Sequence, residues 1–312
     1  PQPYNRMYQL TGTKGFANKY PVEGYAVSAK DMKEAGVTPS NDDLSGHDYL
    51  KETDLKALVE FWAEDTKFCW DGVAARAEWI ALRQISLGKV KFTNSNNAAI
   101  VTEYDVDYLI PAEQKIGVFL PYSGTGAKPL TVDIPRALKK GKSIGANYKF
   151  MFMNVDTFAK FASQEEVVKR CATLIESITG ATDTPDLQTV NACLAKKKEL
   201  YKGLQIVVID QDITIELADG TRNTSNPFED DVILFSESKV LGNTYWKRPI
   251  DAKKMPGSVA EKVMHGHTLI KKYSTESPVQ EVTEGISNLF PAWNLAGRSV
   301  LMQVSANSWN KN

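Results

Sequence analysis

The strongest hydrophobic pattern in the chain lies between Glu52 and Ser86. Apolar side chains recur there at spacings of three and four residues, at Leu55, Leu58, Val59, Trp62, Cys69, Val73, Ala77, Ile80 and Ile85. This spacing predicts one amphipathic helix, with Asp54 suited to its first turn and Gly88 to its end. At a rise of about 1.5 Å per residue the helix would be roughly 50 Å long, which is longer than one compact core covers. Gly72, near the middle, marks a position where it could bend.

Residues 1 to 47 carry no sustained period and are rich in Gly, Pro, Asn and Lys, so they predict an arm or a long loop. Aromatic side chains are nevertheless frequent in this arm, at Tyr4, Tyr8, Phe16, Tyr20 and Tyr25. That is more than a solvated tail would expose. We therefore expect the arm to pack against a neighbouring subunit and to be ordered only in an assembly.

Beyond the helix the pattern changes to a period of two. It predicts strands at 89–93 and 98–106 joined by an Asn-rich loop, and a short helix at 134–140. Strands and helices then alternate, with strand 149–153, helices 156–163, 164–178 and 186–200, and strand 205–210. The remaining apolar runs predict strands at 214–217, 232–235, 268–274, 279–285 and 299–304, with a tight turn at Asp219-Gly220.

Composition narrows the classes of function. Hydrophobic residues are 42% and charged residues 24% of the chain, which excludes gross disorder. The 37 basic and 38 acidic side chains leave a formal net charge of -1, which argues against a protein that holds DNA mainly by neutralising phosphates. Three separated cysteines without a C-x-x-C pair indicate neither a disulfide framework nor a zinc ribbon. No apolar run approaches the ~20 residues of a membrane helix, so we expect a soluble protein made in a reducing compartment.

Two short motifs suggest chemistry. Gly141-Lys142-Ser143 resembles the end of a phosphate-binding loop, but Arg136 stands where that loop needs its earlier glycine. A helix end closed by glycine is the better interpretation. His265-Gly266-His267 could place two imidazoles on one metal ion, but a catalytic site needs a third protein ligand, and the only other histidine is His47 in the arm. We interpret these histidines as polar loop residues.

Catalytic groups are not indicated elsewhere in the sequence. Neither a G-x-S-x-G motif nor a recognisable Cys/His pairing marks a nucleophile. Paired acids are adjacent in sequence, so they diverge on a helix or strand and are typical of solvated or capping positions, as at Asp42-Asp43, Glu165-Glu166 and Asp230-Asp231. We therefore predict no catalytic residue, no cofactor and no metal site, and expect a protein that is not an enzyme.

Several short blocks, in a fixed order, together resemble one family. The end of the predicted helix, residues 76–90, runs through an acidic, aromatic and aliphatic stretch into Gly88-Lys89 and a strand. Later blocks are residues 150–158, 201–208, 230–235, 240–244, 278–284 and 299–304, of which 230–235 followed by 240–244 is the most specific. This order, over roughly residues 50 to 306, resembles the major capsid proteins of tailed bacteriophages, and most closely the lambda-type capsid family with the Hong Kong 97 capsid fold.

The resemblance implies an α+β, Hong Kong 97-like fold. An N-terminal arm or E-loop remnant would occupy 1–45, a peripheral (P) domain with spine helix 52–86 would occupy 46–145, and an α/β axial (A) domain would occupy 146–287. Residues 288–312 would return to the peripheral domain. We expect strand 299–304 to pair in the same sheet as the strands after the long helix, and Trp79 to face packed protein. Fewer than fifty residues precede the helix, so either the E-loop is short or chain is missing upstream.

By the same resemblance the chain is a structural major capsid protein that self-assembles, as pentamers and hexamers, into the icosahedral shell around phage DNA. Expected partners are copies of itself, portal, scaffold or decoration proteins, and double-stranded DNA enclosed without sequence-specific binding; no membrane is involved. It would be made in the host bacterial cytoplasm and end in the virion capsid. Two alternatives stay open: an encapsulin-like protein compartment and, from a different class, a soluble metal-dependent α/β enzyme using His265 and His267.

Overall fold

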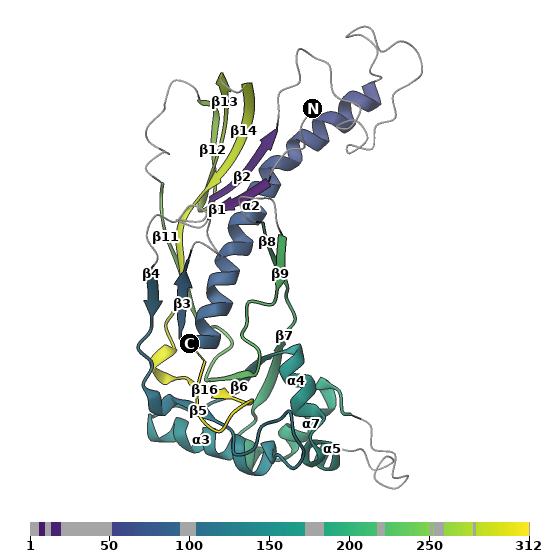
Figure 1. Cartoon of the computed structure of the whole chain (residues 1–312), viewed down its shortest axis with the longest axis vertical. Coiled ribbons are helices and arrows are strands. Elements are labelled where there is room, and N and C mark those ends of the chain that lie inside the picture. Colours follow the sequence, from purple (N-terminus) through teal and green to yellow (C-terminus); the bar gives the residue numbers. More distant parts are fainter. Residues whose placement is uncertain are drawn as a thin grey trace.

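The chain is elongated, with one long helix standing on a compact α/β unit (Figure 1). The computed structural model describes residues 6–9, 14–19, 52–93, 104–171, 184–216, 222–249, 252, 259–276 and 279–311. The helix, α2 (Glu52–Leu87), confirms the prediction for 52–86 and runs without interruption through Gly72. It ends where Gly88 adopts a φ of +77° and donates its N–H to Gln84 O at 2.8 Å, the left-handed helix end for which glycine is suited.

A five-stranded sheet forms the centre of the α/β unit. Its strand order is β5 (Lys115–Gly117), β16 (Val300–Gln303), β10 (Val232–Ser236), β6 (Phe150–Asn154) and β7 (Gln205–Ile209). β10 is antiparallel to both neighbours, whereas β16 is parallel to β5 and β6 is parallel to β7. The helices of this unit are α3 (Ile134–Ser143), α4 (Val155–Ala162), α5 (Glu165–Cys171), α7 (Leu187–Lys196) and α8 (Lys198–Tyr201).

Alternate residues of this sheet enter two different cores. Met151, Ile233 and Met302 lie in one cluster with side chains of α3, α4, α5 and α7. Phe152, Leu234 and Leu301 lie in a second cluster, with Ile85 near the foot of α2 and with Trp293. The helices seen below the sheet in Figure 1 thus cover one face, and the foot of α2 covers the other. Three short helical turns complete the unit, at η1 (Ala112–Gln114), η2 (Pro129–Asp133) and η4 (Ala296–Arg298).

The pairing predicted for strand 299–304 is wrong. The strands after the long helix, β3 (Lys89–Phe92) and β4 (Tyr104–Asp107), form a separate antiparallel pair, whereas β16 lies between β5 and β10. The physical reason is that β16 is buried on both faces, since every one of its residues is buried. This includes the polar Gln303, whose Nε2 donates to Ser305 Oγ and Asn310 Oδ1. Such a strand belongs in the middle of a covered sheet. The division of the chain into domains at 45, 145 and 287 stays a prediction.

A second five-stranded sheet lies along the upper part of α2. It is antiparallel, in the order β1 (Arg6–Gln9), β2 (Lys14–Lys19), β14 (Val279–Ile286), β13 (Thr268–Glu276) and β12 (Val259–His265). The arm prediction is therefore wrong for 6–9 and 14–19, which pair within their own chain. Lys14–Lys19 has little strand character of its own, and its pairing with β14 overrides the local composition. The rest of the predicted arm, with Tyr4, Tyr20 and Tyr25, lies outside the described residues.

Two smaller strand pairs flank α2 between the sheets. One is the ribbon of β11 (Gly242–Lys247) and β15 (Asn288–Trp293), and the other is the hairpin of β8 (Ile213–Glu216) and β9 (Arg222–Ser225). Ile213 packs with Trp79, Ile80 and their neighbours on α2. Trp79 is 8% exposed and lies beneath the Arg76 guanidinium, 3.8 Å from its ring centre, so its predicted packing is confirmed.

The described elements match the other predicted strands and helices closely, within a few residues at their ends. The strands that the sequence pattern did not predict are β1 and β2 in the expected arm, and β5, β9, β11, β12 and β15. The hairpin loop at 94–97, the turn at Asp219-Gly220 and most of helix 164–178 beyond Cys171 lie outside the described residues.

Candidate assembly surfaces

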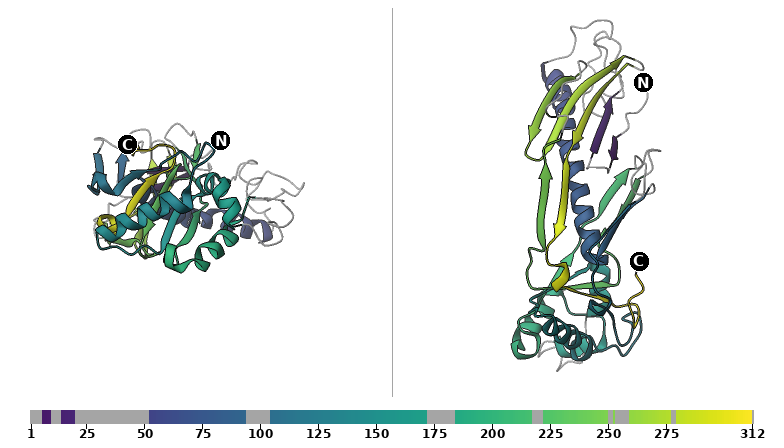
Figure 2. Two further views of the ribbon diagram at one scale, coloured as in Figure 1. Left: turned by 90° about the horizontal axis from the view of Figure 1, so that it is seen from below. Right: turned by 90° about the vertical axis from the view of Figure 1, so that its left-hand side faces the viewer.

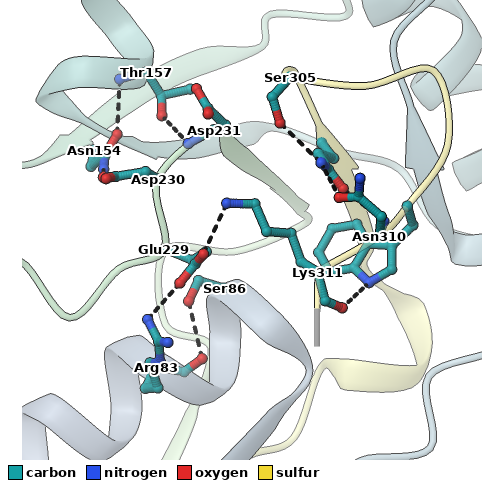
Figure 3. A network of polar contacts seen from close by, with 12 residues as sticks. Arg83, Ser86, Asn154, Thr157, Glu229, Asp230, Asp231, Ser305, Asn310 and Lys311 are labelled. Atoms are coloured by element: carbon teal, nitrogen blue, oxygen red, sulfur yellow. Dashed lines mark hydrogen bonds and ion pairs between the residues drawn. The ribbon is translucent and has the colours of Figure 1, made fainter.

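The turn Glu229–Asp231 joins the long helix to the α/β unit and the C-terminal tail (Figure 3). The Glu229 carboxylate accepts from Arg83 of α2 at 2.6 Å through Oε2, and from Lys311 at 2.9 Å through Oε1. All three side chains are partly buried, so these ion pairs are less screened by solvent than pairs on the open surface. One carboxylate therefore fastens three segments that are far apart in sequence.

The adjacent acids of this turn bind different partners. Asp230 Oδ1 accepts from Asn154 Nδ2, and Asp231 Oδ1 lies 2.7 Å from Lys160 Nζ. Asn154 also caps α4 by accepting from Thr157 N. Asp231 has a φ of +60° and donates its N–H to Thr157 Oγ1 at 2.9 Å. The prediction that Asp230 and Asp231 diverge is confirmed, and both hold the start of β10 against α4.

The C-terminal tail folds back over β16. Gln303 Oε1 accepts from Asn310 N at 2.9 Å, and Gln303 Nε2 donates to Ser305 Oγ at 2.9 Å (Figure 3). Trp309 packs beside the cluster at the foot of α2, and Lys115 Nζ lies 5.8 Å from its ring centre. The tail therefore covers the α/β unit and does not extend away from it.

The ribbon β11–β15 presents exposed aromatic side chains. β15 is the inner strand, because Gln84 Nε2 of α2 donates to Pro291 O. A second link runs through Tyr108, whose Oη accepts from Trp293 N–H and donates to Gln84 Oε1. β11 is the outer strand, and Tyr245 and Trp246 are 60% and 53% exposed. Large aromatic residues at this level of exposure mark a surface suited to contact with another molecule.

A second set of exposed apolar side chains follows β4 and β5. Leu109, after β4, is 82% exposed, and Phe119, after β5, is 69% exposed, with Leu120 next to Phe119 in sequence. Phe119 N–H donates to Asp133 Oδ1 at 3.0 Å, and Tyr122 Oη donates to Asp133 Oδ2 at 3.2 Å. Burial of Asp133 raises the pKa of its carboxyl group above the ordinary 3.8, and the Phe119 N–H and Arg136 only partly offset this. Asp133 thus holds the loop that presents Phe119.

The two histidines of the His-Gly-His motif stand at the turn between β12 and β13, paired as His265↔Thr268. The His267 ring stacks on Trp70 at 6.2 Å between centroids, and its Nδ1 lies 2.9 Å from Thr268 Oγ1. Within the described ranges, no three His, Cys, Asp or Glu side chains come close enough together to hold a metal ion. His47 lies outside these ranges.

The motif Gly141-Lys142-Ser143 forms the last turn of α3 and not a phosphate-binding loop. The predicted helix end at Gly141 is wrong by a few residues: α3 runs to Ser143, and Gly145, with a φ of +75°, follows its end. Gly141 lies against the Tyr148 ring so closely that an added methyl group would overlap it. Within the described residues the structure contains no helix that has both the length and the apolar character needed to cross a lipid bilayer.

The fold brings two cysteines together that the sequence separates. Cys171 on α5 and Cys193 on α7 interact through their side chains. The hydrogen bond from Cys171, helped by Lys197, lowers the pKa of Cys193 to about 6 against the effect of burial. Of the two, Cys193 is therefore the one whose thiolate form is favoured. No sequence signal indicated this pair, because 22 positions separate its members and neither belongs to a C-x-x-C motif.

Comparison with known proteins gives two kinds of similarity. No family model matches the chain. Sixty residues, 19% of the chain, are 62% identical to "Glycosyl hydrolase family 109 protein 5" of Phocaeicola vulgatus, and a stretch of the same length is 40% identical to a family 109 protein of Porphyromonas gingivalis. The chain spans only 12% and 13% of the length of these relatives.

The similarity in structure extends over nearly the whole chain. A crystal structure of a protein assigned as the capsid protein of a prophage in E. coli CFT073 superposes with a TM-score of 0.53 and 14% sequence identity. The match covers 96% of this chain and 77% of that one. The long helix, the α/β unit and the ribbon therefore belong to an α+β fold of the kind seen in phage capsid proteins.

Proposed function

We propose that this chain is the major capsid protein of a tailed bacteriophage, and that many copies assemble into the icosahedral shell that encloses its DNA. The observation that carries the proposal is the likeness in fold, over 96% of the chain, to a protein assigned as a prophage capsid protein. The role is structural and not enzymatic. Its partners would be further copies of itself, portal, scaffold or decoration proteins, and DNA held without sequence-specific contacts.

The Hong Kong 97 type of this fold is supported by where the family-like blocks lie. The block at 76–90 contains the end of α2, the Gly88 helix stop and β3. The most specific block, 230–235, contains the acidic turn and β10, the central strand of the α/β unit. Near-neutral charge suits a wall that contains DNA without gripping it. The protein would be made in the bacterial cytoplasm and end in the virion.

Exposed apolar surface supports assembly over a solitary chain. Tyr245, Trp246, Leu109 and Phe119 are all more than half exposed. A solitary protein would gain solubility by replacing them, whereas a subunit buries them against its neighbours. The same argument applies to an encapsulin-like compartment, so the contents of the particle must separate these two functions.

The test is the size and content of the purified protein. We expect sedimentation velocity to show large particles and negative-stain microscopy to show closed shells of uniform diameter. Particles from phage-producing cells should contain double-stranded DNA, whereas a packaged enzyme would indicate the encapsulin-like alternative. A small species that binds stoichiometric metal through His265 and His267, or hydrolyses glycosides, would contradict the proposal.

A further inference from the structure

β11 is an outer strand whose side chains are exposed along nearly all its length. Asn243 to Lys247 are exposed on both faces of the strand, although β15 beside it is buried at alternate positions. Tyr245 and Trp246 are consecutive, so they point to opposite faces. β11 pairs with β15 on one edge, and within the described residues nothing pairs with its other edge. Among the described residues, the strand therefore presents both its exposed side chains and an unpaired backbone edge.

The exposed groups at the end of β11 share one chemistry. Lys247 and the following Arg248 are exposed cations, and Tyr245 and Trp246 each carry a hydrogen-bond donor on an aromatic ring. Within the part of the chain that the structure describes, none of these four side chains has a hydrogen bond or ion pair. The matching surface on a partner therefore needs carboxylate acceptors. Tyr, Trp and Arg are also the residues that most often carry the binding energy of interfaces.

The same chain carries such acceptors at the turn between β7 and β8. Asp210, Gln211 and Asp212 are all exposed there, and neither aspartate has a side-chain partner among the described residues. The turn is held firmly: Gln211 Nε2 donates to Glu78 Oε2 of α2 at 2.8 Å, and Ile213 is buried beside Trp79. Two carboxylates thus stand on a fixed support, which favours specific pairing with cations.

The two surfaces lie on opposite sides of the molecule. Figure 1 shows β11 to the left of α2 and β9 to its right, and the right-hand view of Figure 2 again places the ribbon and the β8–β9 hairpin on opposite sides of the helix. Surfaces that are complementary and opposite cannot meet within one chain. They can meet between copies in head-to-tail order, and such a contact forms a ring when the rotation between successive copies closes.

We propose that β11 of one copy docks on the β7–β8 turn of the next, with Lys247 and Arg248 paired to Asp210 and Asp212 and with Tyr245 and Trp246 covering the contact. The occupant of the β11 surface is a second copy of this chain. This contact rests on the proposed capsid function and specifies how neighbouring subunits of one ring are joined.

Charge reversal tests the contact. Lys247→Glu with Arg248→Glu should lower the yield of shells at least about tenfold, because like charges then face each other across the interface. Asp210→Lys with Asp212→Lys should have the same effect. The chain with all four changes should recover most of the yield, since every contact then has its charges exchanged. Lys128→Glu with Lys142→Glu, two exposed lysines elsewhere, is the control and should assemble normally.

Covalent trapping provides a second measurement that does not depend on shell yield. In a Cys193→Ser background, which removes the partly exposed native thiol, the chain with Tyr245→Cys and Asp212→Cys should give, on mild oxidation, a ladder of linked dimers, trimers and longer oligomers. Each variant with one introduced cysteine should give no such ladder. Melting temperatures of all variants report whether they fold.

The outcomes separate the two proposals. If the wild-type chain forms no shells, the capsid function fails. If the wild-type chain forms shells and the charge-reversed variants assemble as well as the control does, the contact is wrong. The contact is also wrong if the chain with all four changes folds but does not recover the shell yield. Linked dimers without longer oligomers would mean a two-fold contact and would also overturn the head-to-tail arrangement.

Discussion

The α/β unit and the ribbon β11–β15 are both built from strands, but they differ in what covers them. β10 and β16 are buried along their whole length, because helices cover one face of their sheet and the foot of α2 covers the other. β11 is exposed along nearly all of its length. The α/β unit thus completes its own core, whereas the ribbon leaves surface to be covered. Changes in the first should alter the stability of a single chain, and changes in the second should alter assembly alone.

Removing β16 should break the α/β unit most severely. A chain ending at Gly297 loses the strand between β5 and β10, which opens both cores and leaves unpaired sheet edges. We expect insoluble protein or loss of a cooperative melting transition. A chain ending at Ala306 keeps β16 and loses the contacts of the tail, namely those of Trp309, Lys311 and Asn310, the last with Gln303. It should therefore stay soluble with a lower melting temperature. Soluble protein with normal melting from the shorter chain would contradict this account of the sheet.

Two tryptophans sharpen the comparison directly. Trp79→Ala should lower the free energy of unfolding by about 3–5 kcal/mol, because the ring is buried between α2 and its neighbours. Trp246→Ala should change it by no more than about 0.5 kcal/mol, because the ring is exposed in a single chain. Urea unfolding of the unassembled chain measures both. Equal losses at the two positions would mean that the ribbon is part of the folded core.

Gly141→Ala probes the packing of α3 in the α/β unit. The added methyl group would overlap the Tyr148 ring, and overpacking of this kind costs about 1–3 kcal/mol. Alanine gains about 1 kcal/mol over glycine inside a helix, so we expect a net loss of roughly 1 kcal/mol. Lys142→Ala, one position further on and exposed, is the matched control. A gain in stability at Gly141 would show that the Tyr148 ring moves aside freely.

Asp133 should give the smallest effect, visible as a pH dependence. Its pKa is raised in the folded chain, so its contribution to stability is fully present below the ordinary value of 3.8 and is lost as the pH rises through the raised value. Asp133→Asn keeps an acceptor for Phe119 N–H and removes the titration. The wild type should therefore lose stability relative to this variant, by about 1 kcal/mol or less, between pH 4 and 7. A difference that stays constant over this range would contradict the assignment.

The sequence predicted the long helix and most strands of the α/β unit because their apolar patterns extend over many residues. It failed where pairing depends on distant partners. β15 contains Pro291, which argues against a strand, yet β15 lies beside β11 with Thr244 opposite the proline. β11 has no apolar alternation because neither of its faces is covered. Strand β16 and its neighbour β10 were predicted as strands, but their pairing was not, since burial on both faces appears only in the folded chain.

The candidate surfaces were less predictable than the fold. Glu229 meets Arg83 across 146 positions and Lys311 across 82, and no local pattern encodes such contacts. The sequence predicted that Trp79 is buried, which the structure confirms, but it did not show that Trp246 is exposed. That distinction requires knowledge of which strand lies inside the ribbon.

The long helix has a mechanical consequence for the proposed shell, in which one subunit would fit rings of five and of six. α2 contains 36 residues and is held near its foot by Arg83, Glu229 and Lys311. A lever of about 54 Å that tilts by about 5° at its foot carries its far end through about 5 Å. A tilt of α2 that is too small to break the ion pairs of Glu229 would thus shift the upper sheet by the distance between neighbouring strands. Differences in curvature between positions in a shell would be accommodated by small tilts at the foot of α2, and they would produce larger displacements of its far end.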